Sequence, residues 1–222
     1  MSPNPDLLRA EFLGITVRHE ETVRDREAAA LLLARFGEAY DLNRLEYGEE
    51  GATLSGPTGS ELVLRPAQTA AAGVTNLGFR EGLERVLGLL EEGLSHVGAD
   101  RMWIEDLTLI AVWDTEDPDG ARRYLTDEVL GIDAERRELL GGDDDEEEGA
   151  SHGLRVWRRL GEGALDIAVE PMHTDPSRIY LRLVYAQDEP VYDLQEVGAR
   201  AEAVDAYLHG PLASFIQARA RR

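Results

Sequence analysis

The feature of this chain that most constrains its fold is an internal similarity between its two halves. The segment ITVRHEE at 15–21 resembles IAVWDTE at 110–116, and LVLRPAQT at 62–69 resembles IAVEPMHT at 167–174. The offset is 95 residues for the first pair and 105 for the second. The glycine-flanked acidic stretch 141–149, present in the second half alone, is a candidate source of the increase. Similar segments in the same order predict a duplicated supersecondary unit.

The first half predicts a strand, a helix, a meander of short strands and a second helix. Asp25 is positioned to cap the first helix, and glycine turns separate the short strands. An apolar stripe from Phe79 to Val97 predicts the second helix, and Gly98 ends it. The predicted strands are 10–20, 42–47, 52–55, 61–65 and 74–77, and the first helix is 26–40.

The second half repeats this order. Its first strand, 107–113, is apolar on both faces, so we expect both faces to be covered or paired with the first half. Asp117-Pro118 begins a helix to about 130, and Asp133 begins a short one to Leu140. Period-two patterns predict strands at 154–160, 165–170 and 179–185.

A long helix from Leu194 closes the chain. Pro211 lacks the N–H that would bond to the Tyr207 carbonyl, so we expect a kink at Gly210-Pro211. Its apolar stripe runs to Phe215 at near-heptad spacing. We interpret the stripe as core, with an oligomer seam as the alternative, so a monomer and a homodimer both stay open.

The element order of each half resembles the topology of the TATA-binding-protein-like fold. The resemblance implies an α+β protein of two tandem pseudo-repeats, 1–98 and 99–222, that form one continuous antiparallel sheet backed by helices. It concerns element order alone, because no sequence motif of those DNA-binding proteins is present. A shared fold does not transfer an activity.

The composition excludes several chemistries. The chain of 222 residues has no cysteine and no lysine, which removes disulfides, thiolate nucleophiles, cysteine metal sites and Schiff-base lysines. Its net charge of −21 argues against nucleic acid and anionic membranes as partners. It has no signal-like N-terminus and no run of about 18 apolar residues, so we predict a cytoplasmic protein.

The histidines and carboxylates form no catalytic or metal-binding motif. His19 precedes Glu20 and Glu21, and His173 lies near Glu170 and Asp175, but we interpret both histidines as surface-loop residues. The other three histidines are isolated in sequence. No phosphate-binding loop or nucleophile elbow is present, so the sequence predicts no cofactor, no metal and no catalytic residue.

One face of the second-half sheet is the predicted binding surface. If the three strand faces coincide, they present two aromatics, three arginines and two carboxylates, a mixture enriched at binding hot spots. The alternative is a face whose cross-strand charges satisfy one another. The residues are Arg155, Trp157, Arg159, Asp166, Glu170, Tyr180 and Arg182.

Three hypotheses for function remain open. The first is a non-enzymatic protein that binds a protein or peptide with the open sheet face. The second is an acidic decoy, inhibitor or immunity-like protein for a basic partner, acting through the run 143–148. We interpret that run, however, as a solvated insertion. The third is a small-molecule binder or enzyme with a cavity between sheet and helices. The acidic run consists of Asp143, Asp144, Asp145, Glu146, Glu147 and Glu148.

Overall fold

The structure is a computed structural model of the 222-residue chain and describes residues 3–22, 26–95, 101–117, 120–132 and 152–218. Three predictions lie outside these residues. They are the helix cap at Asp25, the short helix 133–140 and the acidic run 143–148.

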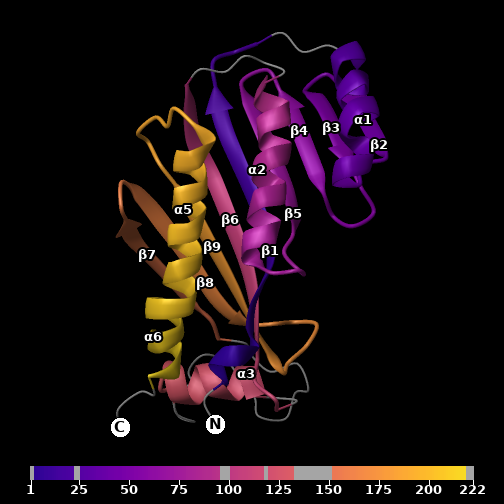
Figure 1. The fold of residues 1–222 in the computed structure, drawn as a ribbon. Helices are drawn as coiled ribbons and strands as arrows, with labels where there is room; N and C mark the ends of the chain where they lie inside the picture. The colour runs from indigo at the N-terminus through magenta and orange to yellow at the C-terminus, as the bar shows by residue number, and fades with distance from the viewer. Residues whose placement is uncertain (1–2, 23–25, 96–100, 118–119, 133–151, 219–222) are drawn as a thin grey trace.

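The fold is α+β, a nine-stranded antiparallel open sheet packed against four helices (Figure 1). The strand order is β2-β3-β4-β5-β1-β6-β9-β8-β7, so the two longest strands, β1 and β6, lie side by side at the middle. The strands are β1 (Leu8–His19), β2 (Arg44–Gly48), β3 (Gly51–Ser55), β4 (Glu61–Arg65), β5 (Gln68–Val74), β6 (Met102–Asp114), β7 (Leu154–Leu160), β8 (Gly163–Pro171) and β9 (Arg178–Ala186).

The described helices cover one face of this sheet or lie at its lower end (Figure 1). The four that cover the face are α1 (Arg26–Tyr40), α2 (Phe79–Ser95), α5 (Leu194–Tyr207) and α6 (Ala213–Gln217). The short α3 (Gly120–Arg123) and the π-helical segment η2 (Tyr124–Val129) lie at the lower end. The opposite face of the sheet is called the open face below.

The stripe on the closing helix is core for most of its length. Val197, Ala201, Val204 and Leu208 are fully buried, whereas Phe215 at its end is 50% exposed. At Pro211 the α-helix gives way to a π-helical turn, η3 (Leu208–Leu212), before it resumes as α6. The missing N–H of proline is thus accommodated by a wider turn, which keeps the apolar stripe against the sheet.

The predicted strand at 74–77 is wrong, because the strand in this region is β5, at Gln68–Val74. Its alanines and glycine have low strand propensity, so the pattern hid it. The small side chains of β5 leave room for helix α2, which lies close to the sheet. A Cβ at Gly93 of α2 would lie 2.9 Å from side-chain atoms of both Leu62 and Thr69.

The two halves of the chain place their strands in the same order. From the middle outward, β1 is followed by β5, β4 and β3, and β6 is followed by β9, β8 and β7. β1 and β6 run antiparallel, with Gly14 opposite Thr108. A Cβ at Gly14 would lie 3.2 Å from the Phe12 ring, so the ring lies over this glycine on the open face.

The burial pattern tests the two sequence matches. Leu62 and Ile167 are both buried on the helix-covered face, in agreement with the offset of 105. Ile15 is also buried there, but Ile110 lies opposite Phe12 and faces the other side. The match of 15–21 with 110–116 therefore pairs residues on opposite faces of the sheet, whereas Leu109 is buried on the same face as Ile15.

Candidate functional site

Strands β7, β8 and β9 bring the seven predicted surface residues to the open face of the sheet. The strand register pairs Trp157 with Asp166, and Glu170 with Tyr180. Arg155 and Arg182 both lie opposite Ala168, one on each side of β8. Arg159 follows Trp157 at the same two-residue spacing. This set is called the β7–β9 surface below.

One ion pair on this surface satisfies part of its charge. The Arg155 guanidinium donates two hydrogen bonds to the Asp166 carboxylate, from Nε to Oδ1 at 3.0 Å and from Nη2 to Oδ2 at 2.7 Å. The bonds from Arg155 hold the pKa of Asp166 below its ordinary value. Arg155 also lies 5.3 Å from the centre of the Trp157 ring. The predicted cross-strand pairing is therefore present, but only for this pair.

The other cationic groups of the surface remain available. Arg159 and Arg182 are exposed and form no ion pair or hydrogen bond with a side chain in the described part of the chain. Trp157 is 67% exposed. A large aromatic ring in solvent between two arginines is the residue pattern of a binding surface.

The open face continues from this surface to the middle of the sheet, where it becomes apolar. Phe12 of β1 and Ile110 of β6 lie opposite each other there, and Val184 of β9 lies beside Asp166. Apolar residues on both faces of β6 agree with the sequence pattern, but these outward-facing side chains were not part of the predicted site. Alternation marked them as outward-facing, and only the strand order shows that they are continuous with Trp157.

The outer edge of β7 is a second available feature. β7 is the last strand of the sheet, so no described strand pairs with its outer backbone N–H and C=O groups. At the other end of the sheet, α1 packs beside the edge strand β2. An unpaired edge is a template for the addition of an extended segment.

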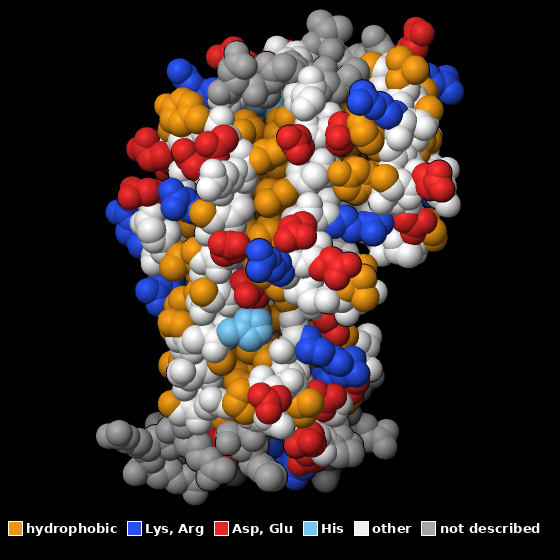
Figure 2. Space-filling model, viewed as in Figure 1, with side chains coloured by type: hydrophobic (Ala, Val, Ile, Leu, Met, Phe, Trp, Pro, Cys, Tyr) orange, Lys and Arg blue, Asp and Glu red, His pale blue; other side chains and the backbone are white. Residues whose placement is uncertain are grey.

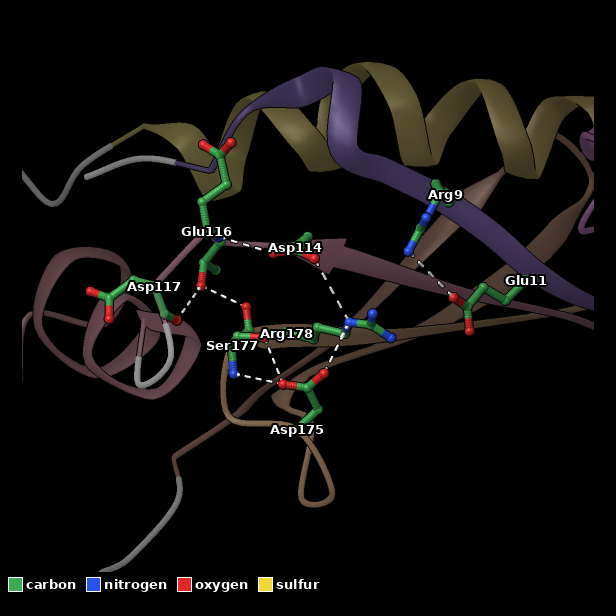
Figure 3. Close-up of polar contacts among 9 residues, drawn as sticks. Arg9, Glu11, Asp114, Glu116, Asp117, Asp175, Ser177 and Arg178 are labelled. Carbon is green, nitrogen blue, oxygen red and sulfur yellow. Dashed lines mark hydrogen bonds and ion pairs between the residues drawn. The ribbon is translucent and has the colours of Figure 1, made fainter.

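A polar cluster at the lower end of β6 and β9 was missed by the sequence analysis (Figure 3). Arg178 Nε lies 3.1 Å from Asp175 and 3.8 Å from Asp114. Ser177 donates a 2.6 Å hydrogen bond to Asp175, and this bond, followed by the Arg178 charge, keeps the pKa of Asp175 below its ordinary value. The contacts join the strand ends. No group of three metal-ligating side chains occurs among the described residues.

The histidines differ from prediction at two positions. His19 is buried, with Nε2 3.1 Å from the Thr69 hydroxyl and Nδ1 2.7 Å from the Glu20 carbonyl, so it is not a surface-loop residue. His173 is exposed. His209 is not isolated, because Asp205 lies one helical turn away at 3.2 Å. Their four-residue spacing was a signal in the sequence.

The described residues define a class of protein, an α+β protein with an open antiparallel sheet that is covered by helices on one face. No family model and no curated protein matches the chain. Its fold has a weak similarity to the crystal structure of the regulatory subunit of aspartate kinase from Thermus flavus, at 11% identity over 90% of this chain and 95% of that one. The TM-score of 0.23 is too low to indicate a shared fold. Among the described helices, none is long and apolar enough to cross a membrane.

Proposed function

We propose that the protein is a non-enzymatic binding protein that takes an extended segment of a partner protein or peptide onto the β7–β9 surface. The observation that carries the proposal is Trp157, 67% exposed in the middle of an edge strand and flanked on the same face by Arg155 and Arg159. Burial of a tryptophan against a partner stabilises a complex by removing a large apolar area from water.

The unpaired edge of β7 supports the same proposal. An extended peptide that lies along β7 gains backbone hydrogen bonds from an additional strand, and side-chain contacts on the open face supply selectivity. Because β7 has seven residues, a peptide of similar length can form backbone hydrogen bonds along the whole strand. The partner segment is therefore expected to bind as a strand.

The charges of the surface favour a partner segment with acidic side chains. Arg159 and Arg182 form no ion pair in the described part of the chain, whereas Arg155 is hydrogen-bonded to Asp166, whose carboxylate also interacts with the charge of Arg182. The chain as a whole carries a net charge of −21, so this attraction is local. We expect a segment with an apolar residue against Trp157 and carboxylates that reach Arg159 and Arg182.

The finer architecture is also a proposal: residues 1–98 and 99–222 are tandem pseudo-repeats with a topology similar to the TATA-binding-protein-like fold. The shared strand order, the antiparallel β1–β6 pairing and the equivalence of Leu62 with Ile167 support it. Relatives of this chain should show half-to-half similarity at offsets of 94 residues for Ile15 with Leu109 and 105 for Leu62 with Ile167. Similarity at unrelated offsets would contradict a duplication.

The binding proposal is tested with a displayed library of extended peptides that varies acidic and apolar positions. We expect selected peptides to bind the wild-type protein in fluorescence polarisation, and the Trp157→Ala, Arg182→Ala double variant to bind them at least about tenfold more weakly. Hydrogen exchange should show new protection of β7 amides in the complex.

The matched control is the Tyr192→Ala, Arg44→Ala double variant. Tyr192 is 61% exposed and lies outside the strands, and Arg44 belongs to the far edge strand β2. This variant should bind as the wild type does. Equal binding by both double variants, or dependence on 143–148 with a basic peptide, would instead favour the acidic-decoy hypothesis.

A further inference from the structure

A cavity of about 720 Å³ lies away from the β7–β9 surface, at the N-terminal end of α2. It is bounded by the start of β1, the end of β5, the start of α2, the β3–β4 turn and the π-helical turn η3. Its volume is within the range of small-molecule sites in proteins.

Much of the cavity wall is apolar. Leu8 and Ala10 contribute from β1, Val74 from β5 and Phe79 from the first turn of α2. Figure 2 shows the side of the molecule that carries the helices, where hydrophobic side chains reach the surface between α2 and α5. A ligand in this cavity would therefore need an apolar body.

Two basic residues, Arg9 of β1 and His209 of η3, line the cavity; Arg9 does so from the open-face side of β1, where it lies opposite Val112. Arg9 lies 3.9 Å from Glu11, which also lines the cavity (Figure 3). The hydrogen bond between His209 and Asp205 raises the pKa of the imidazole above its ordinary value. Asp205 on the same helix is the charged group in contact with His209, and Arg9 and Glu11 are the charged residues of β1 that line the same cavity.

Two polar features lie at the α2 end of the cavity. Gly78 precedes α2 and has no side chain with which to cap the N–H groups of the first helical turn. Thr75 is only 2% exposed, lines the cavity, and its hydroxyl has no hydrogen-bond partner in the described part of the chain. A 17-residue helix directs the positive end of its dipole toward this position.

We propose that this cavity binds a small amphipathic carboxylate. The carboxylate lies near His209 and the N-terminus of α2, Arg9 adds a positive charge from the open-face side of the cavity, and the apolar body lies against Val74 and Phe79. Because Glu11 is present, the site selects for a single negative charge rather than for a polyanion. The inference does not depend on the proposed function of the β7–β9 surface.

The test compares decanoate with decanol, which has the same tail but no charge, by isothermal titration calorimetry on the full chain. We expect decanoate to bind at one site and at least about tenfold more tightly than decanol. The preference should be larger at about pH 6 than at about pH 8, because a raised pKa keeps His209 protonated at the lower pH. Decanoate should also shift the NMR signals of Val74 and Phe79.

Three variants localise the site. Arg9→Gln and His209→Gln should each weaken decanoate binding by about tenfold, and only His209→Gln should remove the pH dependence. Arg44→Gln changes an exposed arginine at the far edge of the sheet and should leave binding unchanged. Circular dichroism and thermal unfolding confirm that each variant folds.

The proposal is overturned if decanoate does not bind, or if decanoate and decanol bind equally well. It is also overturned if neither Arg9→Gln nor His209→Gln changes the affinity in a folded protein. The Trp157→Ala variant should still bind decanoate, because Trp157 does not line the cavity. A failure of the cavity proposal can therefore be told apart from a failure of the peptide proposal.

Discussion

β3 and β7 each lie three strands from the middle of the sheet, one in each half of the chain, but their outer sides have different neighbours. β3 is paired on its outer side with β2, and α1 packs beside both strands. β7 has no described strand on its outer side, is two residues longer, and carries Arg155, Trp157 and Arg159 on the open face. At the same face of β3, the residues are Gly51, Thr53 and Ser55.

This difference concerns how the two outer parts of the sheet are covered. In the first half, the added strand β2 protects an edge, which is a common way to prevent unwanted pairing. In the second half, the edge carries large and charged side chains at the positions where the first half has small ones. Comparison of β7 with β3 therefore identifies side chains of β7 that a strand at this place in the sheet does not require.

The largest expected effect is at Trp113, which lies near the end of β6 as His19 lies at the end of β1. Trp113 is fully buried and its indole N–H donates a 2.7 Å hydrogen bond to the Asn4 carbonyl. Trp113→Ala should lower the free energy of unfolding by about 3–5 kcal/mol, because it leaves a large cavity. His19→Ala should cost about 1–3 kcal/mol through lost hydrogen bonds. Urea denaturation followed by circular dichroism measures both, and a larger cost for His19 would contradict the comparison.

The next effect tests the equivalence of β4 and β8. Leu62 and Ile167 are both almost completely buried on the helix-covered face. Leu62→Ala and Ile167→Ala should each lower the free energy of unfolding by about 2–5 kcal/mol. Chemical denaturation of both variants provides the measurement. A near-neutral effect in one half would show that the two sites are packed differently.

A smaller, pH-dependent effect is expected at Asp166. The Arg155 bonds lower the pKa of Asp166 in the folded protein, so their stabilisation is present above the unfolded carboxyl pKa, near 3.9, and is lost as the pH falls through the depressed value. Asp166→Asn should therefore lower the melting temperature at neutral pH, and the difference from the wild type should shrink in acid. Glu61→Gln is the control. A pH-independent difference for Asp166→Asn would exclude the carboxylate charge as its cause.

The smallest expected effect on stability is at Trp157. Because its side chain is mostly in solvent, Trp157→Ala should change the free energy of unfolding by no more than about 0.5 kcal/mol. Thermal unfolding of the purified variant tests this. A large loss of stability would mean that Trp157 is part of the core, and the binding proposal would lose its main support.

The strands of the second half were predictable because their large apolar residues alternate with polar ones. The predicted strand 154–160 has the bounds of β7, and the two-residue turn at Gly161 and Glu162 explains why β7 and β8 pair with matching faces. Alternation therefore predicted which residues of each strand share a face. That the three faces are neighbours follows from the strand order.

Three other features of the structure could not be predicted from the sequence, each for a physical reason. β6 is apolar on both faces, so its sequence gives no sign of which residues face the helices, and the match of Ile15 to Ile110 paired residues on opposite faces. β5 is built from small residues with low strand propensity, and α2 approaches the sheet closely at Gly93. The cavity brings together Arg9 and His209, which are 200 residues apart in sequence, and no local pattern predicts that proximity.

The pairing of β1 with β6 has a consequence for how the protein unfolds. Because the two longest strands of the sheet belong to different halves, neither half can open without breaking the ladder that also supports the other. The amides of this ladder should therefore exchange with solvent only through global unfolding, and at the same free energy on both sides. Calorimetry should then show one cooperative transition in which the measured enthalpy equals the van't Hoff value.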